Sequence, residues 1–159
     1  VCACLEGNRP ILVEVQALVA KTPYGMPRRT AVGFDYNRVT MLLAILERRL
    51  GMDFGAYDAY VNVVGGMRVT EPAADLAVAA ALVSSYRNRP IPHGVLVMGE
   101  VGLTGEVRRI ASPERRIKDA MNLGFKRFVL PMGKLSLDEP CNGIVQVKTL
   151  EEALDKVFA

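Results

Sequence analysis

The sequence has few of the side chains that metal sites and nucleophilic enzymes commonly use. It contains one histidine, His93, three cysteines, Cys2, Cys4 and Cys141, and no tryptophan. A single histidine excludes a histidine-rich metal site, and the odd number and spacing of the cysteines fit no zinc motif. His93 lies in the loop-like run "RPIPHG" with no serine at a telling spacing, which argues against a Ser-His pair. We therefore expect reduced thiols in a cytoplasmic protein and no metal.

Two longer signals are also missing. No apolar run approaches the roughly 20 residues of a membrane-spanning helix, and the start of the chain lacks the pattern of a signal peptide. There is no G-x-x-x-x-G-K-[ST] motif. The run "GEVGLTG", Gly99–Gly105, has spaced glycines but no lysine, so we interpret it as tight turns rather than a phosphate-binding loop. We expect no ATP, Mg or Zn to bind this chain and no membrane partner.

Half of the residues are hydrophobic, which supports a packed core, and the first residue is a valine inside a strand-like run. We therefore expect residues 1–159 to be one domain from a longer protein. The net charge is +3, and 14 of the 20 basic residues are arginine. The planar guanidinium suits phosphate oxygens, although an ordinary solvated surface explains the charge equally well.

Strands dominate the beginning of the chain, and strands then alternate with helices. We expect one long strand over Pro10–Val19, and further strands at "RTAVGF", "YDAYVNVVGG", "KRFVLP" and "GIVQVK". The run "GVLVMGEV" reads as a buried strand that forms a hairpin with "TGEVRRI". This order predicts an α/β or α+β fold with a mixed sheet and packed helices.

Four helices are expected from apolar spacing and end signals. The first has Asp35 or Asn37 as its cap and Gly51 as its stop, and the second begins near Pro72 and is apolar nearly all round. The third follows Ser112 as a cap and stops at Gly124. The last opens with a capping box of Thr149 and Glu152.

The start of the second helix, "VTEPAADLAVAAAL", is where chemistry is expected. Together with "GEVGLTGEVRRI" and "LGFKRFVLP", it resembles the proteolytic domain of Lon proteases, a fold of the ribosomal protein S5 domain 2 type. That domain carries a Pro-Ser-Ala-Gly element and a later catalytic lysine. In this chain the nucleophile position falls on Ala73 and the lysine position on Glu114. The resemblance therefore implies a Lon-like domain with no catalytic residue, although an alanine-rich helix with Asp75 at its positive end is an equally simple explanation.

Longer blocks carry a narrower resemblance. "LEGNRPILVEVQALV", "PRRTAVGFDYNRVTMLLAILERRLG" and "GGMRVTEPAADLAVAAALVSS" are similar to the C-terminal domain of the bacterial DNA repair family RadA, also called Sms. The resemblance implies a role in recombinational repair beside a strand-exchange recombinase, and a ring, expected to be a hexamer, that contacts DNA. It also implies that zinc, ATP and Mg belong to an N-terminal zinc motif and a RecA-like ATPase core, both outside these residues.

Two alternatives stay open. The hairpin is similar to that of the Lon-like domain in competence proteins related to magnesium chelatase, although the opening block fits them less well. The second alternative is a peptidase that uses another nucleophile. The candidates are Ser112, next to the position of the family's catalytic lysine, and Thr70, next to the helix start. Both residues also have an ordinary explanation, as a helix cap and as a polar residue at a strand end.

If the domain contacts DNA, arginine–phosphate contacts should dominate and readout should be independent of sequence. Each candidate has an alternative role in a solvent or intersubunit ion pair. The candidates are Arg28, Arg29, Arg38, Arg108 and Arg109, with Arg115, Arg116 and Lys118 as a further cluster.

Overall fold

The first alternating run folds as two strands rather than the single strand expected over Pro10–Val19. In the computed structural model, which describes residues 1–159, β1 (Cys2–Glu6) pairs antiparallel with β2 (Arg9–Val13). β3 (Val15–Lys21) instead pairs with β5 (Tyr57–Val63). The chain changes partners at Glu14, whose carbonyl accepts the Val64 N–H at 3.0 Å. The run is therefore divided because its two parts pair with different strands. The local sequence pattern does not encode these partners.

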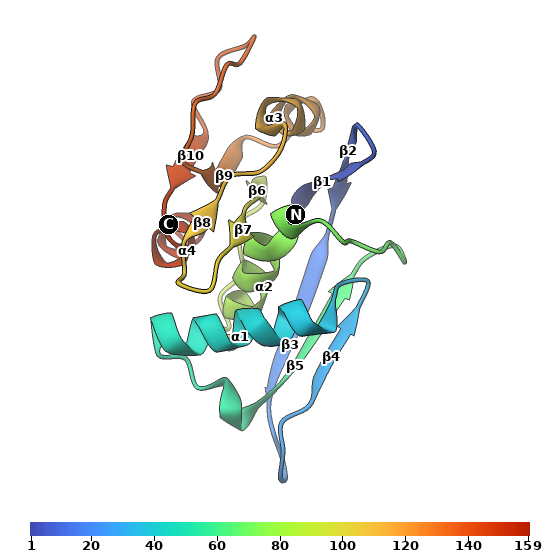
Figure 1. The fold of residues 1–159 in the computed structure, drawn as a ribbon, viewed down its shortest axis with the longest axis vertical. Helices are drawn as coiled ribbons and strands as arrows, with labels where there is room; N and C mark the ends of the chain where they lie inside the picture. Colours follow the sequence, from blue (N-terminus) through green and yellow to red (C-terminus); the bar gives the residue numbers. More distant parts are fainter.

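A mixed sheet forms from the first half of the chain (Figure 1). Its order is β3-β5-β4, where β4 (Arg29–Val32) runs parallel to β5 and β3 runs antiparallel. A short 3-10 turn, η1 (Phe54–Ala56), leads into β5. The expected mixed sheet is therefore confirmed.

The first helix, α1 (Tyr36–Leu50), begins and ends at residues with recognisable end signals. The Asp35 side chain accepts the Arg38 N–H at 2.9 Å, which is an N-cap. Gly51 adopts φ 64°, the left-handed conformation in which glycine commonly ends a helix. Both expected end signals are confirmed, and Asp35 rather than Asn37 is the cap.

The second helix is the centre of the fold. It starts as a 3-10 turn, η2 (Pro72–Ala74), and continues as α2 (Asp75–Arg87). Most of its side chains are buried, as expected, because α2 packs between β3, α1 and the second half of the chain. Figure 1 shows it running through the middle of the molecule.

A parallel sheet forms from the second half of the chain, with strand order β10-β9-β6. The Val97 N–H donates to the Val1 carbonyl at 3.0 Å, which joins this sheet to the β1–β2 hairpin. The remaining elements are β6 (Val95–Val97), β7 (Glu100–Val101), β8 (Val107–Arg108), α3 (Pro113–Asn122), β9 (Arg127–Pro131), β10 (Ile144–Val147) and α4 (Leu150–Val157).

Two expectations in this half need correction. The expected strand "GVLVMGEV" is divided, since β6 joins the parallel sheet and only β7 forms the hairpin with β8. Ser112 precedes α3 but makes no capping bond, because it adopts a left-handed conformation (φ 52°). In contrast, the Thr149 hydroxyl accepts the Glu152 N–H at 3.2 Å, as the capping box predicts. The Glu152 carboxylate returns to the Lys148 N–H at 2.9 Å, one residue earlier than in the standard box.

Candidate functional site at the start of the second helix

The corner that resembles a peptidase nucleophile site is buried. Ala73 is 3% exposed and Ala74 is fully buried. The Ala73 carbonyl accepts the Gly99 N–H at 2.9 Å and the Cys2 thiol at 3.6 Å, and the Leu76 N–H donates to the Gly99 carbonyl at 3.0 Å. These contacts hold β1 and the chain after β6 against the helix start. An alanine methyl in this position has no group that could attack a carbonyl.

Gly99 has a different role from the expected tight turn. A Cβ atom on this glycine would lie 2.7 Å from Cγ1 of Val107 and 3.3 Å from Cδ2 of Leu76. The residue is therefore needed where the chain passes close to the helix start. Gly105, with φ 83°, does form a turn, as the sequence predicts.

Asp75 is fully buried at the first position of α2 and forms an ion pair with Arg38 of α1. The Arg38 Nε donates to the carboxylate at 2.8 Å, and the Val101 N–H donates to it at 3.2 Å. Burial raises the pKa of Asp75 and outweighs the opposing effect of Arg38, while the hydrogen bond to Asp75 raises the pKa of Arg38. The pair ties the two helices together at this corner.

A second ion pair lies a few residues away. Arg116 of α3 is fully buried, and its guanidinium donates to the carboxylate of Glu71, just before the helix start. The same guanidinium donates to the Ala3 carbonyl and the Ala111 carbonyl, each at 2.8 Å. Glu71 also accepts the Leu5 N–H at 2.8 Å. Arg116 thus joins β1, α3 and the entry to α2.

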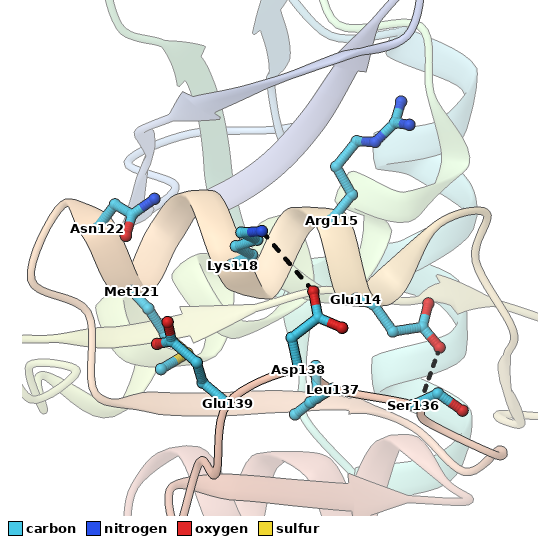
Figure 2. A pocket seen from close by; sticks show the side chains of 9 residues that line it. All are labelled: Glu114, Arg115, Lys118, Met121, Asn122, Ser136, Leu137, Asp138 and Glu139. Carbon is cyan, nitrogen blue, oxygen red and sulfur yellow. Dashed lines mark hydrogen bonds and ion pairs between the residues drawn. The ribbon is translucent and has the colours of Figure 1, made fainter.

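Glu114, at the lysine position, lies on α3 beside a hollow of about 260 Å³ between α3 and the segment 136–139. Figure 2 shows its carboxylate directed toward Ser136, whose N–H donates to it at 3.3 Å. Lys118 and Asp138 approach each other across the same hollow, at 3.7 Å. No hydrogen bond joins Glu114 to the corner around Ala73. The two positions therefore show no contact that resembles a catalytic dyad.

The five candidate arginines are in different environments. The Arg29 guanidinium donates to the carbonyls of Tyr57 and Phe54, so its side chain supports the loop before β5. Arg28 is exposed, and its side chain makes no hydrogen bond or ion pair, although its N–H donates to Asp58 at 2.7 Å. That backbone hydrogen bond is the main cause of a lowered pKa for Asp58.

Arg38, Arg108 and Arg109 also differ. Arg38 is held by Asp75 as described, and Arg108 pairs with Glu106 at 2.9 Å. The pKa of Glu106 is lowered to about 2, first by its hydrogen bond from Thr104 and further by Arg108. Arg109 is exposed and has no such partner, and it borders a hollow of about 210 Å³ that Lys134 also lines.

The further cluster of Arg115, Arg116 and Lys118 does not form one basic surface. Arg116 points into the core, while Arg115 is exposed and donates to the Asn8 carbonyl at 2.7 Å. Sequence reasoning missed Glu71 as the partner of Arg116. One feature of the sequence could have indicated this pair. Glu71 directly precedes an apolar helix, and a carboxylate that becomes buried there needs a cation as its partner.

Two broader features complete the description of the candidate site. No three histidine, cysteine, aspartate or glutamate side chains come together in an arrangement that could hold a metal ion. None of the helices combines the length and the apolar character that crossing a bilayer requires.

Comparison with known proteins gives consistent results. Residues 15–134 match the family model described as subunit ChlI of Mg-chelatase. A protein of Pseudomonas aeruginosa named DNA repair protein RadA is 50% identical over 159 residues, covering 99% of this chain and 35% of the relative. Proteins of the same name from Halalkalibacterium halodurans and Bacillus subtilis are each 47% identical, over 98% and 97% of this chain and 34% of each relative.

The chain thus spans about a third of the length of the curated relatives that it matches. The family model covers most of the chain, and relatives that share one name align along nearly all of it. The chain therefore belongs to the family described as subunit ChlI of Mg-chelatase and, as its sequence blocks predicted, to the RadA family.

Proposed function

We propose that this chain is a Lon-like domain without peptidase activity, which contacts DNA independently of sequence and helps subunits assemble during the repair of recombination intermediates. The observation that carries the proposal is the chemistry of the helix start. Alanine stands at the nucleophile position, a glutamate stands at the lysine position, and Arg38 and Arg116 are bound to buried or partly buried carboxylates. These groups support structure at the corner where a Lon-type peptidase would carry out its reaction.

The peptidase alternative gives a direct prediction. We expect no cleavage of unfolded protein or fluorogenic peptides, and we expect Ala73→Ser combined with Glu114→Lys to remain inactive. The reason is that position 73 is 3% exposed and the buried Asp75 stands beside it. Turnover above the buffer level, measured by fluorescence release and unchanged in Ala73→Val, would point to another nucleophile such as Ser112 or Thr70. Turnover of that kind would contradict the proposal.

DNA contact is proposed to depend on Arg28 and Arg109, the two of the five candidate arginines that are exposed and have no side-chain partner. Arg29 and Arg38 are held by carbonyls and a carboxylate, and the charge of Arg108 is balanced by Glu106. A few phosphate contacts support weak, sequence-independent binding, of the order of 10⁻⁴ to 10⁻⁶ M at physiological salt. A ring of subunits would strengthen this binding by raising the effective concentration of contacts.

The DNA proposal can be tested by replacing the two free arginines and comparing the result with a change at the paired Arg108. We expect Arg28→Ala with Arg109→Ala to weaken binding equally on two unrelated duplexes. Each lost phosphate contact should make the log–log salt slope shallower by about 0.9. The measurement is fluorescence anisotropy over a salt series. The control is Arg108→Ala, compared with the single change Arg109→Ala, and its expected effect is smaller because Arg108 is already paired with Glu106. Unchanged affinity and slope in the double variant would assign Arg28 and Arg109 another role.

Assembly is supported by the outer edge of β3, where the Val19 N–H donates to the Ser85 hydroxyl at 2.8 Å but no second strand pairs. This strand pairs only with β5, and no charged residue or proline interrupts it between Val15 and Ala20. The side chain of Leu18 is 58% exposed, and residues 15–18 line a hollow of about 670 Å³ together with residues of β5 and α2. Edges of this kind, without charge or proline, pair readily with other chains.

An assembly prediction follows from this edge. Leu18→Lys is expected to weaken self-association about tenfold or more, because the contribution of burying a leucine is about 1.5–3 kcal/mol. Sedimentation velocity over a concentration series measures this change. Val32→Lys is the control, since Val32 is 55% exposed on the opposite edge strand of the same sheet. Equal oligomer mass in the wild type and Leu18→Lys would remove β3 from the interface.

We further propose that the protein acts in the cytoplasm beside a strand-exchange recombinase, and that a hexamer is the assembled form. Any zinc, ATP and Mg are proposed to belong to other parts of the longer relatives. The description of the family model favours the competence-protein alternative, but the relatives from Pseudomonas aeruginosa, Halalkalibacterium halodurans and Bacillus subtilis are each named DNA repair protein RadA. Binding to branched DNA as well as linear duplex would separate the repair role from this alternative.

A further inference from the structure

Two thiols lie in contact beneath the helix start. Cys2 and Cys4 are two residues apart in β1, so their side chains leave the same face of the strand. Cys2 is fully buried, Cys4 is 5% exposed, and their sulfur atoms are 3.8 Å apart. The Cys2 thiol also donates to the Ala73 carbonyl at 3.6 Å. The candidate site described above uses neither sulfur for chemistry.

The strand places these residues within reach of a covalent bridge. A rise of about 3.3 Å per residue separates their Cα atoms by about 6.6 Å. Natural disulfides join Cα atoms that are about 4.4–6.8 Å apart. A sulfur–sulfur bond therefore requires movement of the side chains and a small bend at Ala3, not a change of strand register.

Of the two thiols, Cys4 is the one that borders a surface hollow. It lines a hollow of about 390 Å³, together with Met67, Arg68 and Thr70. A hydrogen bond with Cys2 is the main cause of a lowered pKa for Cys4, and the nearby Arg116 acts in the same direction. The same hydrogen bond and burial raise the pKa of Cys2. Cys4 is thus suited to attack first, because the thiolate is the nucleophile, and Cys2 is suited to react second.

We propose that Cys2 and Cys4 are a modification site, which hydrogen peroxide converts to an intramolecular disulfide and thiol reductants restore. The Cys4 thiolate attacks one peroxide oxygen, the O–O bond breaks, and the other oxygen leaves and takes up a proton as water. Cys4 is now a sulfenic acid. The Cys2 sulfur attacks the Cys4 sulfur, the S–O bond breaks, and the hydroxide leaves as water with the proton of Cys2. Two thiols lose two electrons, and hydrogen peroxide becomes two waters.

The test treats the whole chain with hydrogen peroxide, followed by alkylation and peptide mass spectrometry. We expect a monomer lighter by two hydrogens, with the bridge inside the peptide that contains Cys2 and Cys4, and reversal by dithiothreitol. Cys141→Ser should behave in the same way, since Cys141 lies on the distant segment before β10. In Cys2→Ser, Cys4 should stop at the sulfenic acid and be trapped by dimedone.

Each outcome bears on the proposal. In Cys4→Ser, oxidation of Cys2 should be slower by about tenfold or more, because a buried thiol with a raised pKa reacts poorly. Circular dichroism checks that each variant folds, and the wild-type experiment decides even if a variant does not fold. The proposal is overturned if Cys2 and Cys4 remain free thiols after Cys141 is fully oxidised. It is also overturned if the only disulfides join two chains.

Discussion

Replacing Arg116 by methionine is expected to lower the free energy of unfolding by about 3–5 kcal/mol. Arg116 is fully buried and donates to Glu71 and to the carbonyls of Ala3 and Ala111. Methionine fills much of the volume but donates no hydrogen bond. The variant therefore leaves the partly buried Glu71 carboxylate with the Leu5 N–H as its remaining donor, and it removes one donor from two carbonyl oxygens. Urea denaturation followed by circular dichroism measures the change.

The neighbouring Arg115 is the matched control for this experiment. It belongs to the same helix but is exposed, and it makes one hydrogen bond, to the Asn8 carbonyl. Arg115→Met should cost at most about 1 kcal/mol, as exposed charged contacts usually do. Adding Glu71→Met to Arg116→Met should cost less than the two single changes together, because it removes the unpaired carboxylate. Equal losses from Arg115→Met and Arg116→Met would show that the buried ion pair has no special role.

The second large effect is expected from Arg38→Met. The change leaves Asp75 fully buried with the Val101 N–H as its remaining donor. Breaking a buried pair in this way costs about 3–5 kcal/mol when the remaining group stays charged. Arg48→Met, an exposed change in the last turn of the same helix, is the control and should have a small effect. Urea denaturation at several pH values gives the comparison.

The pH dependence of this loss has a definite sign. Burial already raises the pKa of Asp75, and removing Arg38 raises it further. An acid with a raised pKa in the folded state binds its proton more tightly there than in the unfolded state. The stabilisation from that proton is present below the unfolded pKa and is lost as pH rises through the folded pKa. The loss of unfolding free energy caused by Arg38→Met should therefore be largest at neutral pH and smaller in acid. A deficit that grows in acid would contradict this account.

Arg38 and Arg116 both stabilise the start of the second helix. The position that resembles a catalytic corner is held by two long-range ion pairs, one from α1 and one from α3. Buried ion pairs add little net stability compared with apolar packing, but removing one partner is costly. The corner is therefore expected to be sensitive to single changes in either ion pair.

Much of the local structure followed from the sequence alone. The apolar spacing and the end signals at Asp35 and Gly51 predicted α1 correctly, because a helix is specified by neighbours within one or two turns. The nearly continuous apolar run after Pro72 predicted the buried α2. The sequence blocks also predicted the RadA family correctly.

Other features depended on contacts between distant residues. The division at Glu14 arises because β2 and β3 find different partner strands, and the run of residues itself contains no stop signal. Ser112 preceded its helix as a cap should, yet its backbone conformation prevents the capping bond.

The arginines show most clearly which features the sequence determines and which the tertiary structure decides. Composition determined the arginine excess, and the sequence predicted several arginines as candidates for phosphate contact or for ion pairs. Tertiary packing decided that Arg38 meets Asp75, 37 residues away, and that Arg116 meets Glu71, 45 residues away. A guanidinium in the core must find a carboxylate or carbonyls, because an unpaired buried charge is too costly. That requirement, which acts only once the chain is folded, separates the arginines that support the structure from those left free for a ligand.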